Sequence, residues 1–173
     1  MDNYASLGSG RKFPVKGRYT LRTAESFPAE AFGTSRAGAL TVQIDPTIVG
    51  PNSEGRTLKY TRISGKSFKR GNTSVSQIGD YLKSVGVTGT FGNWQQLADA
   101  VEQTAGRIFE ADLDWRAYDK STGRTIEGME AFPSDGNGGH VPYVLSETEK
   151  DEEGNAKRVW ANLEVVRFIP LAS

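Results

Sequence analysis

The strongest constraint on the fold is a stretch of strict alternation from Arg107 to Tyr118, RIFEADLDWRAY. Its residues are alternately apolar and mostly charged, which is the period-two pattern of a strand with one buried face. Trp115 is in phase with the apolar residues, so we expect it in the core. A strand of this length needs partner strands, and the chain must therefore build a sheet around it.

Other stretches carry the same period-two signature. Strands are predicted over residues 17–24, 39–44, 56–63 and 158–169. In the third of these, Leu58, Tyr60 and Arg62 are expected on one face. Segments 26–38 and 48–55 are predicted to be loops, because Gly, Pro and Ser interrupt them repeatedly.

The period changes to that of helices after residue 73. A helix is predicted to begin at Ser74, with Ser74 and Gln77 as a capping box and Gly86 just past its end. A second helix is predicted to begin at Asn93, whose side chain can accept a hydrogen bond from the first turn, and to end at Gly106.

The order of these elements predicts a fold class. Three strands, a helical connection and two principal strands match the order of the OB-fold, a five-stranded Greek-key barrel with helical residues between strands 3 and 4. Between the last two strands we expect a short strand over 125–131, a loop over 132–140 and an acidic hairpin tip over 147–155. Residues 1–16 are predicted to be a flexible basic arm, and residues 17–173 a single OB-like domain.

Composition excludes several kinds of chemistry. The chain has no cysteine, so thiolate catalysis, disulfides and cysteine zinc sites are excluded, and its one histidine is His140. No carboxylate is placed nearby to orient this histidine, so we expect a solvent-exposed loop residue rather than a catalytic base. Glu110, Asp112 and Asp114 share a strand face, as the ligands of a two-metal nuclease would. The simpler interpretation is a wet strand face balanced by Arg116, and we expect no enzyme activity, metal or cofactor.

Charge is separated along the chain. Residues 1–73 carry 12 Lys and Arg against 5 Asp and Glu, whereas residues 74–173 carry 9 against 16. This separation favours an anionic partner for one face, or complementary charged regions within the fold or between copies. No apolar run reaches the length of a membrane span, and the first residues show no signal-peptide core. We therefore expect no membrane association and a cytoplasmic location.

The most directional feature for function is the segment from Gly55 to Gly71, GRTLKYTRISGKSFKRG, which has six cations, two aromatic rings and no carboxylate. Cations follow phosphates and rings stack on bases, so this composition favours single-stranded nucleic acid bound without regard to its sequence. The alternative is a solvated strand whose lysines keep a sheet edge soluble. The candidate binding residues are Arg56, Lys59, Tyr60, Arg62, Lys66, Phe68, Lys69 and Arg70.

Two further rings are candidates for stacking on bases. Tyr118 lies on the polar side of the long alternating strand. Trp160 is expected on the outer side of the last strand, unless a helix or loop covers it.

Four stretches of the chain together resemble a known family: GRYTLR, IGDYLKSVG, FEADLDWRAYD and VWANLEVVRFIP. Over residues 17–170 they resemble the small single-stranded-DNA-binding proteins of bacteriophage replication and recombination modules, which are OB-fold proteins. The resemblance implies a non-enzymatic protein of the host cytoplasm that protects unpaired DNA strands during replication or recombination. Homo-oligomers and contacts with replication or recombination proteins are further expectations.

Two alternative functions remain open from the sequence. A virion or assembly component would use the charge separation for head-to-tail contacts between copies. A metal-dependent nuclease would use the three acidic residues of the long strand.

Overall fold

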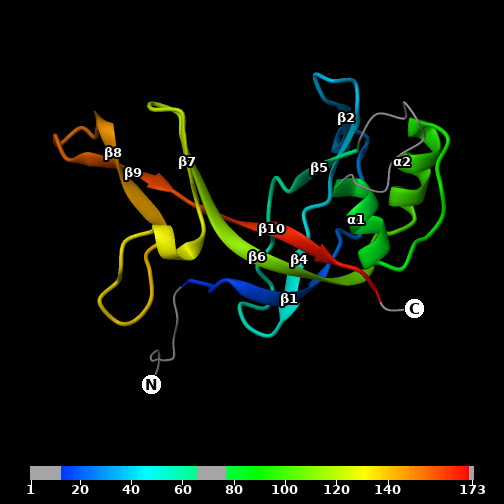
Figure 1. Cartoon of the computed structure of the whole chain (residues 1–173), viewed down its shortest axis with the longest axis horizontal. Helices are drawn as coiled ribbons and strands as arrows, with labels where there is room; N and C mark the ends of the chain where they lie inside the picture. The colour runs from blue at the N-terminus through cyan, green and yellow to red at the C-terminus, as the bar shows by residue number, and fades with distance from the viewer. Residues whose placement is uncertain (1–12, 66–76, 172–173) are drawn as a thin grey trace. The chain divides into compact units, whose positions relative to one another are not determined.

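A computed structural model of the chain describes residues 13–65 and 77–171 (Figure 1). The described residues are mainly β, with antiparallel pairs of strands. The elements, in chain order, are β1 (Gly17–Arg22), η1 (Ala29–Ala31), β2 (Phe32–Thr34), β3 (Leu40–Gln43), β4 (Thr47–Gly50), β5 (Arg62–Ser64), α1 (Gln77–Ser84), α2 (Trp94–Glu102), β6 (Ile108–Asp119), β7 (Arg124–Glu127), η2 (Met129–Ala131), β8 (Tyr143–Lys150), β9 (Ala156–Trp160) and β10 (Asn162–Ile169).

The described strands form three open sheets. One has five strands, in the order β10–β6–β1–β4 with β7 also paired to β6. The second has the order β2–β3–β5, and the third consists of β8 and β9 alone. The predicted closed five-stranded barrel is therefore not seen among the described residues. The helices do lie between the third and fourth of the predicted strands, as expected.

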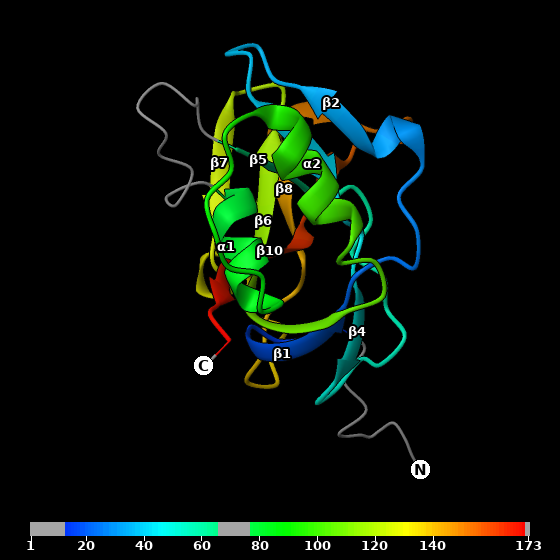
Figure 2. The ribbon, with the colours of Figure 1, turned by 90° about the vertical axis from the view of Figure 1, so that its right-hand side faces the viewer.

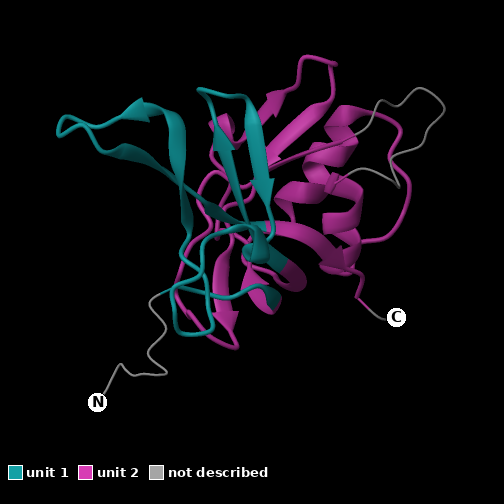
Figure 3. Ribbon diagram, turned by 60° about the vertical axis from the view of Figure 1, so that its left-hand side comes forward, with its two compact units in different colours: residues 1–17, 113–164 teal, residues 18–112, 165–173 magenta. Residues whose placement is uncertain are grey.

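The chain divides into two compact units (Figure 3). Unit 1 comprises residues 1–17 and 113–164, and unit 2 comprises residues 18–112 and 165–173. The division falls within β1, β6 and β10, so each of these strands contributes residues to both units.

The long alternating strand β6 is confirmed, along with the identity of its buried face. Phe109, Ala111, Leu113, Trp115 and Ala117 are all at most 4% exposed, whereas most of the residues between them are partly or fully exposed. The phase of this pattern decides which side chains of the strand enter the core. Trp115 is buried as predicted.

In unit 2 the two helices lie side by side (Figure 2). The Asn93 side chain accepts a hydrogen bond from the Gln96 amide at the start of α2, as predicted. Gly86 follows α1 with a φ of 83°, a left-handed conformation that glycine adopts without steric cost. The Gln77 side chain accepts a hydrogen bond from the Ser64 amide. Ser74, its predicted capping partner, lies outside the described residues.

A buried hydrogen-bond chain organises the core of unit 2 around Tyr81. Thr104 donates to the Val101 carbonyl at 2.6 Å, so its only hydroxyl hydrogen is already used. Tyr81 must then donate to Thr104, at 2.8 Å, and accept from Thr23, at 2.5 Å. Burial raises the pKa of the Tyr81 hydroxyl. The Tyr81 ring also packs edge-on against Phe109.

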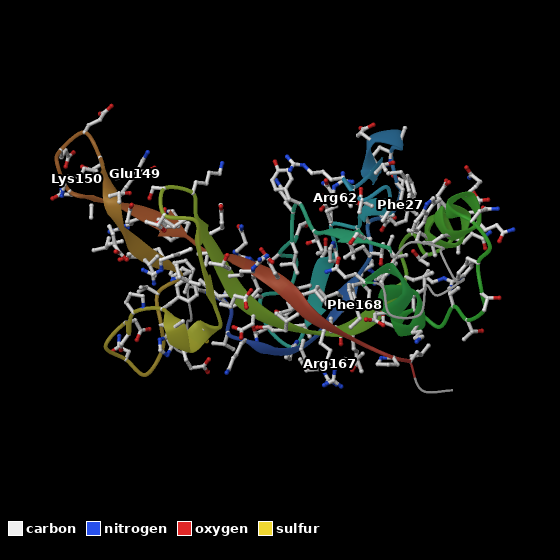
Figure 4. The ribbon with its side chains drawn as sticks, turned by 45° about the horizontal axis from the view of Figure 1, so that its top comes forward. Phe27, Arg62, Glu149, Lys150, Arg167 and Phe168 are labelled. Carbon is white, nitrogen blue, oxygen red and sulfur yellow. The ribbon has the colours of Figure 1, made fainter. Side chains whose placement is uncertain are left out.

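Phe168 completes this aromatic cluster from β10. Its ring centroid lies 5.7 Å from that of Tyr81 and 5.8 Å from that of Phe109. Figure 4 shows Phe168 and its neighbour Arg167 leaving β10 on opposite sides, as expected for successive residues of a strand.

In unit 1 the core is arranged around Trp115. Its indole N–H donates to the Pro14 carbonyl at 3.0 Å, and the rings of Phe13 and Phe132 pack edge-on against it. Lys16 forms an ion pair with Glu130. Residues 13–16, the end of the predicted flexible arm, are therefore packed against this unit.

The predicted third strand, 56–63, is wrong in extent and in its faces. Only Arg62–Ser64 forms a strand, β5, because Tyr60 has a φ of 64°, which no strand residue adopts. Leu58 is 4% exposed while Tyr60 is 82% exposed, so these two side chains do not share a face.

Two predicted loops contain short strands. Segment 26–38 contains β2, which pairs with β3, and segment 48–55 overlaps β4, which pairs with β1. These strands are three and four residues long, too short for their period to stand out among Gly and Pro. The predicted last strand, 158–169, is two strands interrupted at Ala161, because β9 pairs with β8 and β10 belongs to the five-stranded sheet.

None of the helices in the described parts of the chain is long and apolar enough to cross a membrane.

We predict that Tyr81→Phe lowers the free energy of unfolding by about 1–3 kcal/mol, because it leaves the buried hydroxyls of Thr23 and Thr104 each without one partner. Urea denaturation followed by circular dichroism measures this change. Tyr60→Phe is the matched control: its hydroxyl belongs to a side chain that is 82% exposed, and its removal should leave stability unchanged. Equal stability of the two variants would contradict a stabilising role for the hydrogen bonds of the Tyr81 hydroxyl.

Candidate nucleic-acid interface

The described part of the cationic segment is a turn anchored on both sides. Before the turn, the Leu58 amide donates to the Pro46 carbonyl at 2.8 Å, and its side chain is buried. After it, the Thr61 amide donates to the Asp45 carboxylate at 3.1 Å, and the Thr61 hydroxyl donates back to Leu58 at 2.7 Å. Hydrogen bonds to Asp45 and Pro46 of the same chain thus fix both ends of the turn.

Lys59 and Tyr60 occupy the tip of this turn, and both are exposed. The φ of 64° at Tyr60 places a bulky residue in the left-handed region, which costs free energy and is uncommon outside glycine. The strained backbone turns the ring away from the buried Leu58 and into solvent, where it is 82% exposed. A flat ring beside an ammonium group is thus presented outward by a fixed backbone.

Arg62 lies next to this turn, but its guanidinium contacts its own chain. It donates to the Thr41 hydroxyl at 2.9 Å and to the Ala31 carbonyl at 3.4 Å. It also donates to the Glu30 carbonyl at 3.3 Å and to the Gln43 amide oxygen at 3.4 Å. The guanidinium thus joins η1 and β3 to β5.

Of the other predicted residues in this segment, Arg56 is exposed. Lys66, Phe68, Lys69 and Arg70 lie outside the described residues, so their positions stay predictions.

Tyr118 lies on the polar face of β6, as predicted, and is 57% exposed. Its partner across the ladder is Thr125 of β7. Arg116 shares this face and forms ion pairs with Glu127, at 3.1 Å, and Glu164, at 3.7 Å. The nearest cation on the same strand face is therefore already neutralised.

Trp160 lies on β9 and is 52% exposed, so neither a helix nor a loop covers it fully. It belongs to a cluster with Tyr143, whose ring centroid is 5.0 Å away. The Arg158 guanidinium carbon lies 4.5 Å from the Tyr143 centroid and 5.9 Å from that of Trp160. Such distances give a cation–π attraction.

From the sequence, Tyr143 was one of the rings expected to face solvent, but neither it nor Arg158 was expected beside Trp160. The signal was present, because residues 143 and 160 become cross-strand neighbours once the acidic tip is recognised as the turn of a hairpin. The prediction of one continuous strand over 158–169 joined β9 to β10, so residue 160 was not paired with residue 143. No strand was predicted over β8, and its second half, residues 147–150, was predicted as part of the acidic tip.

The β8–β9 hairpin is tied to the turn between β6 and β7, within unit 1. The Thr148 hydroxyl donates to Ser121 at 2.6 Å, and Ser121 donates to the Asp119 carboxylate at 2.6 Å. The hydrogen bonds from Ser121 lower the pKa of Asp119. Arg124 adds an ion pair with Glu147.

The three acidic residues of β6 that a nuclease would use are engaged by other groups. Asp112 accepts from Arg18 at 2.6 Å, Glu110 lies 3.8 Å from the same guanidinium, and this pairing raises the pKa of Arg18. Asp114 accepts from the Met129 amide at 2.8 Å. In the described ranges, no group of three or more His, Cys, Asp or Glu residues is arranged to hold a metal ion.

His140 differs from its prediction. It is half-buried, and its Nδ1 lies 2.7 Å from the Phe132 carbonyl oxygen, so the ring is held in place. The turn before it is closed by Asp135, whose carboxylate accepts from the Asn137 and Gly139 amides. These hydrogen bonds lower the pKa of Asp135.

We predict that Arg62→Met lowers the free energy of unfolding by about 1 kcal/mol, because the hydrogen bonds that join three segments of unit 2 are lost while the aliphatic stem is kept. Urea denaturation measures the change. Arg56→Met removes the same charge from an exposed residue and should leave stability unchanged. If both variants were equally stable, the guanidinium of Arg62 would have no structural role.

We also predict that Tyr60→Gly leaves the free energy of unfolding unchanged or raises it by up to about 1 kcal/mol, because glycine adopts the left-handed conformation without steric cost. Lys59→Gly is the control and should lower stability by about 0.4–1 kcal/mol through the added freedom of the unfolded chain. Thermal denaturation of both variants measures the difference. A clear loss of stability in Tyr60→Gly would mean that the ring packs against its own chain.

No family model, curated protein or solved structure matches this chain.

Proposed function

We propose that this protein binds single-stranded DNA without sequence preference and is not an enzyme. The observation that carries the proposal is the Lys59–Tyr60 turn, where an 82% exposed ring stands beside a lysine on a backbone fixed at both ends. A solvent-facing ring stacks on any base, and an adjacent ammonium group pairs with the phosphate next to it. The strain at Tyr60 supports a binding role, because it favours exposure of the ring over its burial.

Further groups extend the proposed site. Arg56, Lys66, Lys69 and Arg70 would contact phosphates, and Phe68 would stack on a base. Tyr118 and Trp160 are exposed rings of unit 1, at 57% and 52%, and are proposed as stacking positions of that unit by itself. Arg62 is assigned instead to holding the turn in place, because its guanidinium is used by Thr41 and the backbone of η1.

The biological setting is part of the same proposal. Protection of unpaired strands in phage replication or recombination, and a Greek-key order of the OB type, follow from the resemblance noted in the sequence. The nuclease alternative is disfavoured, because Arg18 is paired with Asp112 and lies close to Glu110, the carboxylates that a metal would need.

We predict that the protein binds a fluorescent dT oligonucleotide at 50 mM salt and loses affinity at 300 mM, because phosphate contacts release counterions. Tyr60→Ala should weaken binding about 5- to 100-fold, which corresponds to the loss of one stacked base at about 1–3 kcal/mol. Tyr60→Phe keeps the ring and should bind like the parent protein. Fluorescence anisotropy measures all three.

Lys59→Gln provides an independent check of the phosphate contact. It should reduce the slope of log affinity against log salt by about 0.7, the value for one phosphate of a single strand. No binding at 50 mM salt, or affinity indifferent to salt, would rule the proposal out. Normal binding by Tyr60→Ala would move the site away from this turn.

A further inference from the structure

The β8–β9 hairpin has an outer edge that no described strand completes. The two strands pair only with each other. Tyr143 is opposite Trp160 and Leu145 is opposite Arg158, so these four side chains share one face. Leu145 is 58% exposed and Trp160 is 52% exposed. An exposed apolar edge of this kind is a template for pairing with another strand.

The register shows which backbone groups of β9 point outward. The Ala161 amide donates to the Pro142 carbonyl at 2.8 Å, one position beyond the Tyr143–Trp160 pair. Hydrogen-bonded and non-hydrogen-bonded pairs alternate in an antiparallel ladder, so Tyr143–Trp160 is non-hydrogen-bonded. The same holds for Arg158, two residues earlier. The N–H and C=O groups of Arg158 and Trp160 therefore point away from β8, along the free edge of β9.

The outer edge of β8 is less accessible than that of β9. Val144 and Leu145 line a cavity of about 330 Å³ together with Thr125, Ile126 and other residues of β7 and its surroundings. Glu147 of β8 also forms an ion pair with Arg124 at the start of β7, and Thr148 donates a hydrogen bond to Ser121 just before β7, within unit 1. β9 is therefore the edge of the hairpin that can take a further strand.

The side chains of β9 carry a charge that the described chain does not neutralise. Lys157 lies 4.0 Å from Glu149, but no carboxylate of the described residues lies within ion-pair distance of Arg158. Its guanidinium is held over the rings of Tyr143 and Trp160 instead. A strand added to β9 is therefore favoured if it carries a group that attracts a cation opposite Arg158, such as an aromatic ring.

We propose that the strand completing this edge is β9 of a second copy of the chain, antiparallel about a two-fold axis through Val159. This register aligns the outward backbone groups of Arg158 with those of Trp160 in the second copy, and the reverse. Each guanidinium then faces an indole across the new ladder, a second cation–π contact. On the opposite face, the two Val159 side chains meet in a non-hydrogen-bonded pair.

Neighbouring registers are less favourable. An axis through Arg158 opposes two like charges, which destabilises a strand pair. An axis through Trp160 would place Arg158 opposite Asn162, which begins β10 and already belongs to the five-stranded sheet. Only the axis at Val159 pairs each cation with a ring.

The antiparallel arrangement also separates the acidic turns of the two hairpins. Figure 4 shows Glu149 and Lys150 at the turn end of the hairpin, and three more carboxylates follow at Asp151, Glu152 and Glu153. In an antiparallel pair these turns point in opposite directions. Since β9 has only five residues, the contact buries much less than the roughly 1,600 Å² of a stable interface, so the dimer should be weak.

A cysteine cross-link tests the register directly, because the chain contains no cysteine. In the full-length variant Val159→Cys, the paired Cα atoms would lie about 4.5 Å apart, within reach of a disulfide. Lys157→Cys is the matched control on the same strand, because its two copies would be offset by four residues, about 13 Å. Under mild oxidation without nucleic acid, we expect Val159→Cys to form covalent dimer at least tenfold faster than the control, as measured on non-reducing gels.

Sedimentation velocity of the cysteine-free protein provides the second measurement. We expect the parent protein to show a reversible dimer at tens to hundreds of micromolar, and Arg158→Glu to be monomeric over the same range. Tyr60→Ala should still dimerise, which separates this result from the DNA-binding proposal. A monomeric parent protein, dimerisation unaffected by Arg158→Glu, or cross-linking no faster in Val159→Cys than in Lys157→Cys would overturn the inference.

Discussion

The alternation of β6 is the constraint on which the rest of the structure depends. Its apolar residues are buried over nearly the whole length of the strand, in unit 2 up to Asp112 and in unit 1 from Leu113 onward. A shift of one residue would move every one of these side chains to the polar face. In unit 2 the phase brings Phe109 against Tyr81, and in unit 1 it brings Trp115 against Phe132. Both cores are thus specified by the period of one strand.

The sequence predicts those parts of the fold in which the pattern of apolar residues repeats over a long element, or which depend on neighbouring residues alone. β6, the Asn93 cap of α2 and the burial of Trp115 are of this kind, because each depends on residues within one element. The short strands β2 and β4 could not be predicted, since their pairing is decided by residues far along the chain. The positive φ at Tyr60 likewise interrupts the strand predicted over 56–63, which the alternation of side chains had favoured.

The candidate site shows the same limit at the level of single side chains. The residue type of a cation in a basic segment does not show whether its side chain faces a phosphate or its own backbone. Arg62 is used by η1 and β3, while Lys59 is exposed at the tip of the turn. Tyr143 and Arg158 became neighbours of Trp160 only through the hairpin register. The cations and rings of the segment were thus evident from the sequence. Which of them are exposed, and which contact their own chain, is seen only in the fold.

Arg158 is oriented by aromatic rings rather than by a carboxylate. An ion pair loosens as ionic strength rises or as its acid takes up a proton, but a phenol ring and an indole carry no charge near neutral pH. The orientation of this guanidinium should therefore persist at high ionic strength, where screening removes its attraction for distant charges. Most surface cations lose both their orientation and their long-range attraction when salt is added. At Arg158 the attraction can be lost while the orientation is kept.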